Sequence, residues 1–332
     1  MRIASSYASI LKRLVGMAAL AASALAFSQA QDYPTRTITI VVPAPPAGAT
    51  DVLARVMADE LGKRLGQTVI VDNKPGASGM LGASAVARSA PDGYTLFLSH
   101  AAPIYYAPYM FSKVPYDVKR DFALITEVCS ASLVFAVGKD VPVRSMKELV
   151  SWAQANKGKL NYGSFGVGSS SHLLMAYLSE SRRLGMEHVA YKGEAPMMQD
   201  IIGGQIPMGV GTLGTMAPHI ASGSLRALAI IGDKRLPEMP DVPTMAEAGF
   251  TDEEFKQLGG VMLTAPAKTP APVLARLETE ARAVVQTAAM KARFQAFGLV
   301  GMGNSSAEFK KNLEASGPVI QKLVLVSGAK VD

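Results

Sequence analysis

This sequence of 332 residues contains a single cysteine, and neither acidic nor basic residues are in large excess. The single cysteine, Cys129, excludes an intramolecular disulfide, so the fold must rest on packing. We expect Cys129 to be a small, buried apolar side chain. Lys and Arg total 33 against 27 Asp and Glu. So mild a basic excess gives no case for binding nucleic acid.

Catalytic and cofactor motifs are also missing. The sequence has neither a Walker-type phosphate loop nor a GxSxG nucleophile elbow. The stretch GVG at 166–168 begins like a dinucleotide fingerprint but lacks its third glycine, so NAD is not expected. No His or Cys lies at metal-ligand spacing from any of the four histidines, His100, His172, His188 and His219. We therefore expect no cofactor, no metal and no enzymatic activity, and a structural role for His188 and His219.

One long apolar run is present, and it lies near the N-terminus. Residues 14–27 (LVGMAALAASALAF) follow a basic stretch, and the small residues Ser28 and Ala30 precede Gln31. The pattern predicts a secretory signal peptide over residues 1–30, with a membrane anchor as the alternative. It also predicts a soluble periplasmic protein. Without the three basic residues of the leader, 33 − 3 = 30 basic residues stand against 27 acidic ones.

Strand and helix patterns alternate along the rest of the chain. The predicted strands are 37–42, 68–73, 94–99, 132–138, 160–164, 187–193 and 226–232. The predicted helices are 50–66, 74–90, 145–156, 172–185, 195–205 and 269–287. Thr50 is the expected N-cap of the first helix, and Gly66 its end. This alternation predicts an α/β fold with parallel sheets, arranged as two similar units around a cleft.

In each half, one turn leaves a strand and enters a helix through Gly, Ala, Ser and Thr. The first turn spans 43–51 and the second spans 164–172. The start of a helix carries unpaired N–H groups and a partial positive charge, so an uncovered start can bind a carboxylate without a basic side chain. Serines 169–171 add hydroxyl donors. Tight helix–sheet packing is the alternative explanation, but two such turns favour a binding site.

Five blocks resemble the extracytoplasmic solute-binding proteins of tripartite tricarboxylate transporters, the Bug-type receptors. The resemblance covers essentially the whole mature chain. The blocks are YPTRTITIVVPAPPAGATDVLAR (33–55), VDNKPGASGMLGASAVARSAPDGYTLFL (71–98), KLNYGSFGVGSSSHL (159–173), YKGEAPMMQDIIGGQIPMGV (191–210) and LRALAIIGDKRLPEMPDVPTMAEAGF (225–250).

This resemblance implies a two-lobed periplasmic-binding-protein (flytrap) fold, with 31–128 and 255–332 in lobe 1 and 129–254 in lobe 2. It also implies that ligand carboxylates rest on the two turns. Carried over residue by residue, the ligand-binding positions are Ala47, Gly48, Thr50, Asp51, Gly76, Ala77, Ser164, Gly166, Ser169, Ser170 and His172. Two roles stay open: Asp51 either accepts from a ligand amine or favours the helix start, and His172 either lines the site or caps and packs.

Four positions depart from the family pattern. An aromatic residue often stands where this chain has Ala44, and a glycine where it has Ala47. A tryptophan is frequent near Leu258, and an acidic or other polar residue near Gly211. We therefore expect a roomier or more apolar cleft than usual.

The resemblance also implies the partners. These are a small organic acid or acidic amino acid and the membrane subunits of a transporter, to which a monomeric receptor delivers its ligand. Presentation of the ligand to a membrane sensor is the alternative, and the sequence does not separate the two.

Overall fold

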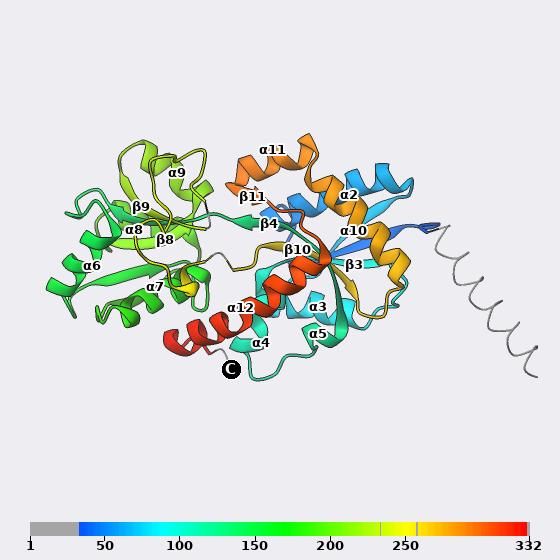
Figure 1. Cartoon of the computed structure of the whole chain (residues 1–332), viewed down its shortest axis with the longest axis horizontal. Coiled ribbons are helices and arrows are strands. Elements are labelled where there is room, and N and C mark those ends of the chain that lie inside the picture. The colour runs from blue at the N-terminus through cyan, green and yellow to red at the C-terminus, as the bar shows by residue number, and fades with distance from the viewer. Residues whose placement is uncertain (1–32, 233, 257, 331–332) are drawn as a thin grey trace, which may run out of the picture.

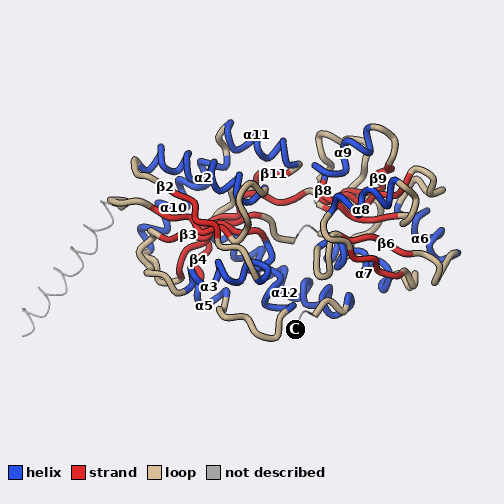
Figure 2. Tube along the Cα trace, turned by 180° about the vertical axis from the view of Figure 1, so that it is seen from behind, coloured by secondary structure: helices blue, strands red, loops and turns tan. Residues whose placement is uncertain are grey.

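The computed structural model describes residues 33–232, 234–256 and 258–330. The predicted signal peptide, residues 1–30, lies outside the described residues. Figures 1 and 2 show two lobes, each built on its own sheet with helices on both faces. The predicted two-lobed α/β fold is thereby confirmed.

The first lobe is built on a six-stranded sheet with the strand order β11-β4-β10-β3-β1-β2. Its strands are β1 (Ile38–Val42), β2 (Val69–Asn73), β3 (Thr95–His100), β4 (Phe122–Ala131), β10 (Val261–Pro266) and β11 (Leu299–Gly301). Its helices are α2 (Ala49–Leu65), η1 (Ala77–Gly79), α3 (Met80–Ala87), η2 (Ala102–Tyr106), α4 (Ala107–Met110), α5 (Val118–Asp121), α10 (Ala271–Val285), α11 (Ala288–Phe297) and α12 (Ser306–Ser327).

The second lobe is built on a five-stranded sheet with the order β7-β6-β8-β5-β9. Its strands are β5 (Leu133–Gly138), β6 (Asn161–Ser164), β7 (Glu187–Ala190), β8 (Met208–Thr212) and β9 (Leu225–Ile231). Its helices are α6 (Met146–Ala155), α7 (Ser170–Ser181), α8 (Glu194–Ile202) and α9 (Leu213–Ala221), and η3 (Glu253–Phe255) follows on the return segment.

Both sheets are mixed, which corrects the expectation of parallel sheets. Strand β1 pairs in parallel with β2 and β3, whereas β10 runs antiparallel to β3 and β4. Likewise β6 is parallel to β7 and β8, but β5 is antiparallel to β8 and β9. Strands β5 and β10 each follow a crossing between the lobes. Their direction is therefore set by where the chain re-enters the sheet and not by a strand–helix–strand unit.

Helix α2 follows from its apolar spacing. Leu53, Met57 and Leu61 recur every fourth residue and are fully buried, and Gly66 ends the helix with φ 68°. The prediction that Thr50 is the N-cap is wrong, because the helix begins at Ala49 and Gly48 is its N-cap. Glycine has no side chain, so no side-chain hydrogen bond caps the start of α2.

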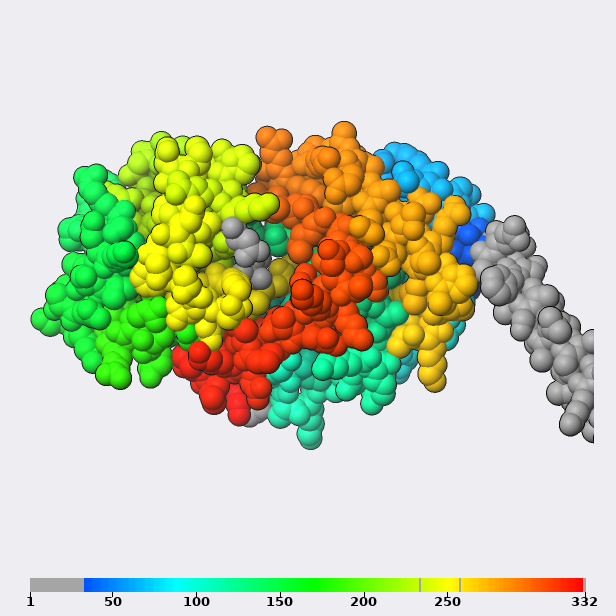
Figure 3. Space-filling view, viewed as in Figure 1, coloured from blue at the N-terminus to red at the C-terminus, as the bar shows by residue number. Residues whose placement is uncertain are grey.

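Three segments connect the lobes. The chain crosses from β4 to β5 through Ser132, and it returns from β9 to β10 through residues 232–260. Helix α12 starts on the first lobe and packs against α7 of the second lobe. In Figure 3 this helix, drawn in orange-red to red, runs from the front of the first lobe to the lower side of the second.

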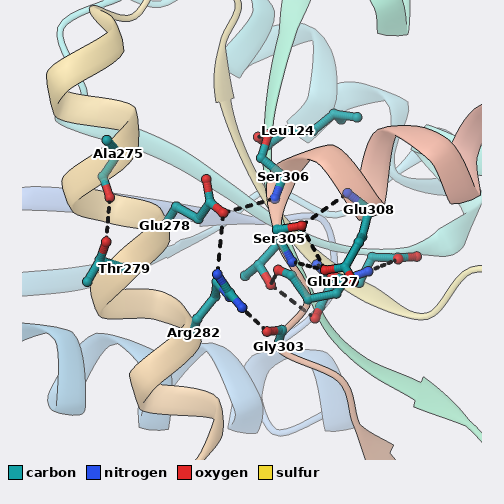
Figure 4. A network of polar contacts seen from close by, with 12 residues as sticks. Leu124, Glu127, Ala275, Glu278, Thr279, Arg282, Gly303, Ser305, Ser306 and Glu308 are labelled. Carbon is teal, nitrogen blue, oxygen red and sulfur yellow. Dashed lines mark hydrogen bonds and ion pairs between the residues drawn. The ribbon is translucent and has the colours of Figure 1, made fainter.

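Polar contacts fix the start of α12 to the first lobe (Figure 4). Ser305 and Glu308 form a reciprocal capping box. The Ser306 hydroxyl donates to the Leu124 carbonyl at 2.7 Å, and its N–H donates to Glu278 at 3.1 Å. This end of α12 therefore moves with β4 and α10.

Glu127 of β4 is buried beside the same helix start. Its carboxylate accepts from the Tyr105 hydroxyl at 2.6 Å, from Asn304 Nδ2 at 2.6 Å and from Asn312 Nδ2 at 2.7 Å. These neutral donors satisfy the buried charge and tie α12 to β4 and η2.

Candidate functional site

The first strand-to-helix turn is held in shape by Asp51. This carboxylate is 1% exposed and accepts from Ala47 N, Arg55 Nε and Asn73 Nδ2, each at 2.9 Å. Burial raises the pKa of Asp51, but the bonds from Arg55, Asn73 and Ala47 outweigh it and hold that pKa below its ordinary value. Both carboxylate oxygens are therefore engaged within the protein. The geometry favours the structural role over acceptance from a ligand amine.

The backbone beyond Asp51 keeps unused donors. Ala47 adopts φ 68°, and its N–H is taken by Asp51. Within the described part of the chain, no hydrogen bond uses the N–H groups of Gly48, Ala49 or Thr50. The start of α2 is thus open to an anion, as the bare sequence of the turn predicts.

In the second turn, Ser164 and Ser169 shape the backbone. The buried Ser164 Oγ lies 2.6 Å from His188 Nε2 and accepts from Gly166 N at 3.3 Å. Ser169 is the N-cap of α7, accepting from His172 N at 3.3 Å and donating to Gly166 O at 2.7 Å. Gly166 adopts φ 145°, which favours glycine.

The His172 side chain is hydrogen-bonded to the backbone of this turn. Its Nδ1 accepts from Gly168 N at 3.1 Å, and its ring stacks on His188 with centroids 3.7 Å apart. Burial, with a smaller effect of His188, lowers the pKa of His172 to about 4, so the ring is neutral at pH 7. These contacts are those of the packing role for His172, and its predicted contact with a ligand stays a prediction.

Ser170 is the predicted residue that faces the space between the lobes. It is the first residue of α7, and neither its N–H nor its hydroxyl has a partner among the described residues. It lines a cavity of about 260 Å³. The apolar residues around that cavity include Leu133, Leu173, Leu174, Ile231, Leu258 and Val261.

Both lobes and the return crossing contribute to this interlobe cavity. Residues of the first turn are not among the described residues that line it. His100, at the end of β3, connects the two: it lines the cavity, and its ring is hydrogen-bonded to the Pro43 backbone. Sequence reasoning missed His100, because its spacing matches no metal or catalytic pattern.

Gly76 and Ala77 lie farther out. Both are exposed, with φ of 125° and 48°, and they form the turn that leads into η1 and α3. They are absent from the described lining of the interlobe cavity. Their predicted contact with ligand stays a prediction.

A third helix start at the cavity is already filled by a side chain. Glu194 accepts from Thr212 N at 2.6 Å, from Thr212 Oγ1 at 2.8 Å and from Thr215 Oγ1 at 2.5 Å, at the beginning of α9. A Cβ on Gly211 would lie 3.4 Å from Glu194 Oε1. Glu194 therefore supplies an acidic group beside Gly211, where the family often has a polar residue. The sequence feature that could have indicated this acidic group is Glu194 itself, at the first position of α8.

A larger cavity of about 690 Å³ borders the crossings and α12. It includes Glu127, Lys234 and Arg235 but no residue of either turn. We place the candidate site in the smaller cavity because that one reaches Ser170 at the start of α7.

Other chemistry has little support among the described residues. They contain no group of three or more His, Cys, Asp and Glu arranged to hold a metal. Cys129 is buried, as expected, and burial raises the pKa of its thiol to about 12. None of the helices in the described ranges is both long and apolar enough to cross a membrane.

Comparison with known proteins places these features in context. Residues 53–325 match the model of the tripartite tricarboxylate transporter family receptor. Protein BugT of Bordetella pertussis is 34% identical over 286 residues, covering 86% of this chain and 87% of BugT. A Cupriavidus necator protein described as "UPF0065 protein in gbd 5'region" is 38% identical over 263 residues, covering 79% and 77%.

Solved structures resemble the whole described chain. A protein of R. palustris with adipate has a TM-score of 0.73 and 29% identity, covering 90% of this chain and 99% of that one. MatC from Rhodopseudomonas palustris, with bound malate, has a TM-score of 0.68 and 28% identity, covering 88% and 100%. The periplasmic binding protein BugD has a TM-score of 0.69 and 31% identity, covering 90% and 99%.

Proposed function

This chain belongs to the tripartite tricarboxylate transporter receptor family, and we propose that it captures a small carboxylate between its lobes and delivers it to a transporter of that type. Its family and structural neighbours are substrate-binding receptors, so the chain is a solute receptor and not an enzyme. The family and the periplasmic-binding-protein fold inferred from the sequence blocks are confirmed.

One observation carries the carboxylate proposal: two helix starts, those of α2 and α7, keep backbone N–H groups without partners among the described residues, whereas that of α9 is filled by Glu194. A ligand carboxylate at the start of α7 would accept hydrogen bonds from Ser170, as the Glu194 carboxylate accepts them from Thr212. The adipate and malate held by two similar proteins are both carboxylates, which supports the same chemistry here.

We also propose that the receptor acts in the periplasm after removal of residues 1–30. The signal-peptide pattern and the location given for two similar structures support this. Intact-mass measurement of protein from the periplasmic fraction should give a chain that begins at Gln31.

A matched pair of substitutions at Ser170 tests the binding site. Ser170→Asp places a negative charge where the ligand carboxylate should lie, whereas Ser170→Asn places a neutral group of the same size there. Loss of a hydrogen bond to a charged group costs roughly 1.5–3 kcal/mol, so the Asp variant should bind carboxylates at least about tenfold more weakly in calorimetric titration. Adipate, malate and benzoate serve as probes.

The ligand-free melting temperature is the control. An acid in the first turn of a helix is neutral or favourable for the fold, so Ser170→Asp should melt no lower than the parent. If the Asp variant is folded and binds the probe acids as tightly as the parent, the carboxylate does not lie at the start of α7.

A further inference from the structure

The polar groups from the first lobe that face the interlobe cavity are already hydrogen-bonded. His100 Nδ1 accepts from Ala102 N at 3.2 Å, and its ring also bonds the Pro43 backbone. The Tyr106 hydroxyl donates to the Leu258 carbonyl at 3.0 Å. Neither side chain has a spare donor directed at a ligand.

The polar side chains that the second lobe and the return crossing contribute to the cavity also have partners within the protein, with one exception. The Thr212 hydroxyl donates to Glu194 at 2.8 Å. Lys256 Nζ lies 2.5 Å from Glu253 Oε1, and both side chains are more than half exposed, so this ion pair lies at the solvent-facing side of the cavity and not in its apolar body. Ser170 is the exception among the polar side chains that line the described cavity, since its hydroxyl has no partner among the described residues.

Most of the other side chains of the cavity wall are hydrocarbon. Leu133, Leu173, Leu174, Ile231 and Val261 are nine-tenths or more buried, and they surround a space bordered by Ser170. The site therefore has one polar end, at the start of α7, and an apolar body.

We propose that the ligand is an amphipathic monocarboxylic acid, with its carboxylate at Ser170 and its hydrocarbon body among these leucines. The inference rests on the proposed function and specifies the substrate class of the same site. The cavity volume of about 260 Å³ exceeds the roughly 150 Å³ of an apolar cavity that holds benzene, so an acid with a ring or a short alkyl chain fits inside it. Heptanoate and benzoate are acids of this kind.

A second carboxylate or several hydroxyls on the body would disfavour binding. They would leave water and meet side chains that are apolar or already paired, and an unpaired buried charge is costly. The cavity thus selects against acids such as citrate and malate, which carry polar groups along their whole length.

A homologous series on the unmodified mature protein tests this inference. Titration with acetate, butyrate, hexanoate and heptanoate should lower Kd about fourfold for each methylene that is buried, from about 0.8 kcal/mol per methylene. Hexanoate and adipate have the same six-carbon chain and differ in the second carboxylate. Hexanoate should bind at least about tenfold more tightly than adipate.

A variant of the cavity wall adds an independent measurement. Leu258→Asn puts an amide into the apolar wall, so it should weaken heptanoate binding severalfold and by a larger factor than it weakens acetate binding. The matched control is Leu325→Asn, since Leu325 is 73% exposed on α12 and should affect neither acid.

The outcomes separate this inference from the function on which it rests. A fall of Kd along the series together with the preference for hexanoate supports it. Tighter binding of adipate, malate or citrate than of hexanoate, or a Kd independent of chain length, overturns it and leaves carboxylate capture standing. Failure of every acid to bind overturns both.

Discussion

At the scale of single residues, Gly48 keeps the start of α2 open. Its φ of −73° suits any residue, and a Cβ there would lie 3.7 Å from Pro45 O, an ordinary contact. Gly48→Asp should raise the free energy of unfolding by a few tenths of a kcal/mol, because Asp is a better N-cap than Gly. The Asp oxygen also takes the free N–H groups at the start of α2. Because no described residue of the first turn lines the interlobe cavity, monocarboxylates held at Ser170 should bind this variant about as tightly as the parent.

Gly48→Asn is the matched control for charge, because Asn caps a helix about as well as Asp does. Urea denaturation and calorimetric titration of the three proteins give both quantities. Weaker binding by the Asp variant alone would contradict this expectation and would add the start of α2 to the site. Ser169→Val is a poorer probe, since Ser169 caps α7 and its loss would cost about 1 kcal/mol of stability.

The pKa of His172 predicts a second residue-scale effect. The folded value of about 4 lies below the ordinary 6.5, so between those pH values the unfolded chain binds a proton that the folded chain does not. Stability should therefore be complete above pH 6.5 and fall as the pH drops toward 4, with a slope of at most about 1.4 kcal/mol per pH unit.

His172→Asn isolates this effect from the titration of carboxylates. The Asn oxygen is suited to accept from Gly168 N, as Nδ1 does, but it does not titrate. Denaturant midpoints of the parent and the variant from pH 4 to pH 8 should diverge below pH 6.5. Parallel curves would mean that His172 is as easily protonated in the fold as in the unfolded chain.

The sequence predicted where the turns lie but not how their residues divide the work. Serines 169, 170 and 171 are equivalent in the sequence, yet Ser169 caps α7, Ser171 donates to the Val210 carbonyl at 2.7 Å, and Ser170 alone borders the cavity. A shift of one residue in the helix start would exchange these roles. Glu194 was missed for the same reason, because its partner Thr212 is 18 residues away.

At the scale of elements, predictions succeeded where the signal is local. Helix α2 lies within one residue of its predicted span of 50–66. Strand β10 and helix α12 were not predicted. β10 is buried throughout and has no alternation, and its partners β3 and β4 are far away in the sequence. α12 contains Gly317 and Pro318, a pair that reads as a break in a helix although packing on α7 continues it.

The contact between α7 and the return crossing gives a prediction at this scale. Arg182, the C-cap of α7, pairs with Asp252 at 2.6 Å, and the Tyr177 hydroxyl donates to the same carboxylate at 2.9 Å. Asp252→Asn should lower the free energy of unfolding by about 1–2 kcal/mol, because these partners are partly buried.

Asp59→Asn is the matched control. Asp59 also pairs with a cation, Lys63, at 2.6 Å, but its side chain is 66% exposed, so its loss should cost less than about 0.5 kcal/mol. Urea midpoints measured at one salt concentration compare the two. Equal losses would show that the site of Asp252 is no better shielded than the surface.

At the scale of the whole molecule, the lobes touch where α9 meets the end of α11. A Cβ on Gly214 would lie 2.9 Å from the Phe297 carbonyl, and one on Gly298 would lie 2.5 Å from Gly214 N. Both obstacles are backbone atoms, so neither moves aside cheaply. Two glycines thus permit the observed approach of the lobes around the interlobe cavity.

Gly214→Ala should therefore hold the lobes apart. Within α9 the change is favourable, because Ala exceeds Gly in helix propensity by up to about 1 kcal/mol, so the second lobe should not lose stability. When the lobes close around a ligand, however, the added Cβ clashes with the Phe297 carbonyl, and this clash offsets part of the binding free energy. We expect a larger radius of gyration in small-angle X-ray scattering and a Kd for heptanoate or adipate raised about tenfold, the equivalent of 1.4 kcal/mol. An unchanged radius with unchanged affinity would mean that this contact relaxes freely and that the separation of the lobes is set at the three connecting segments.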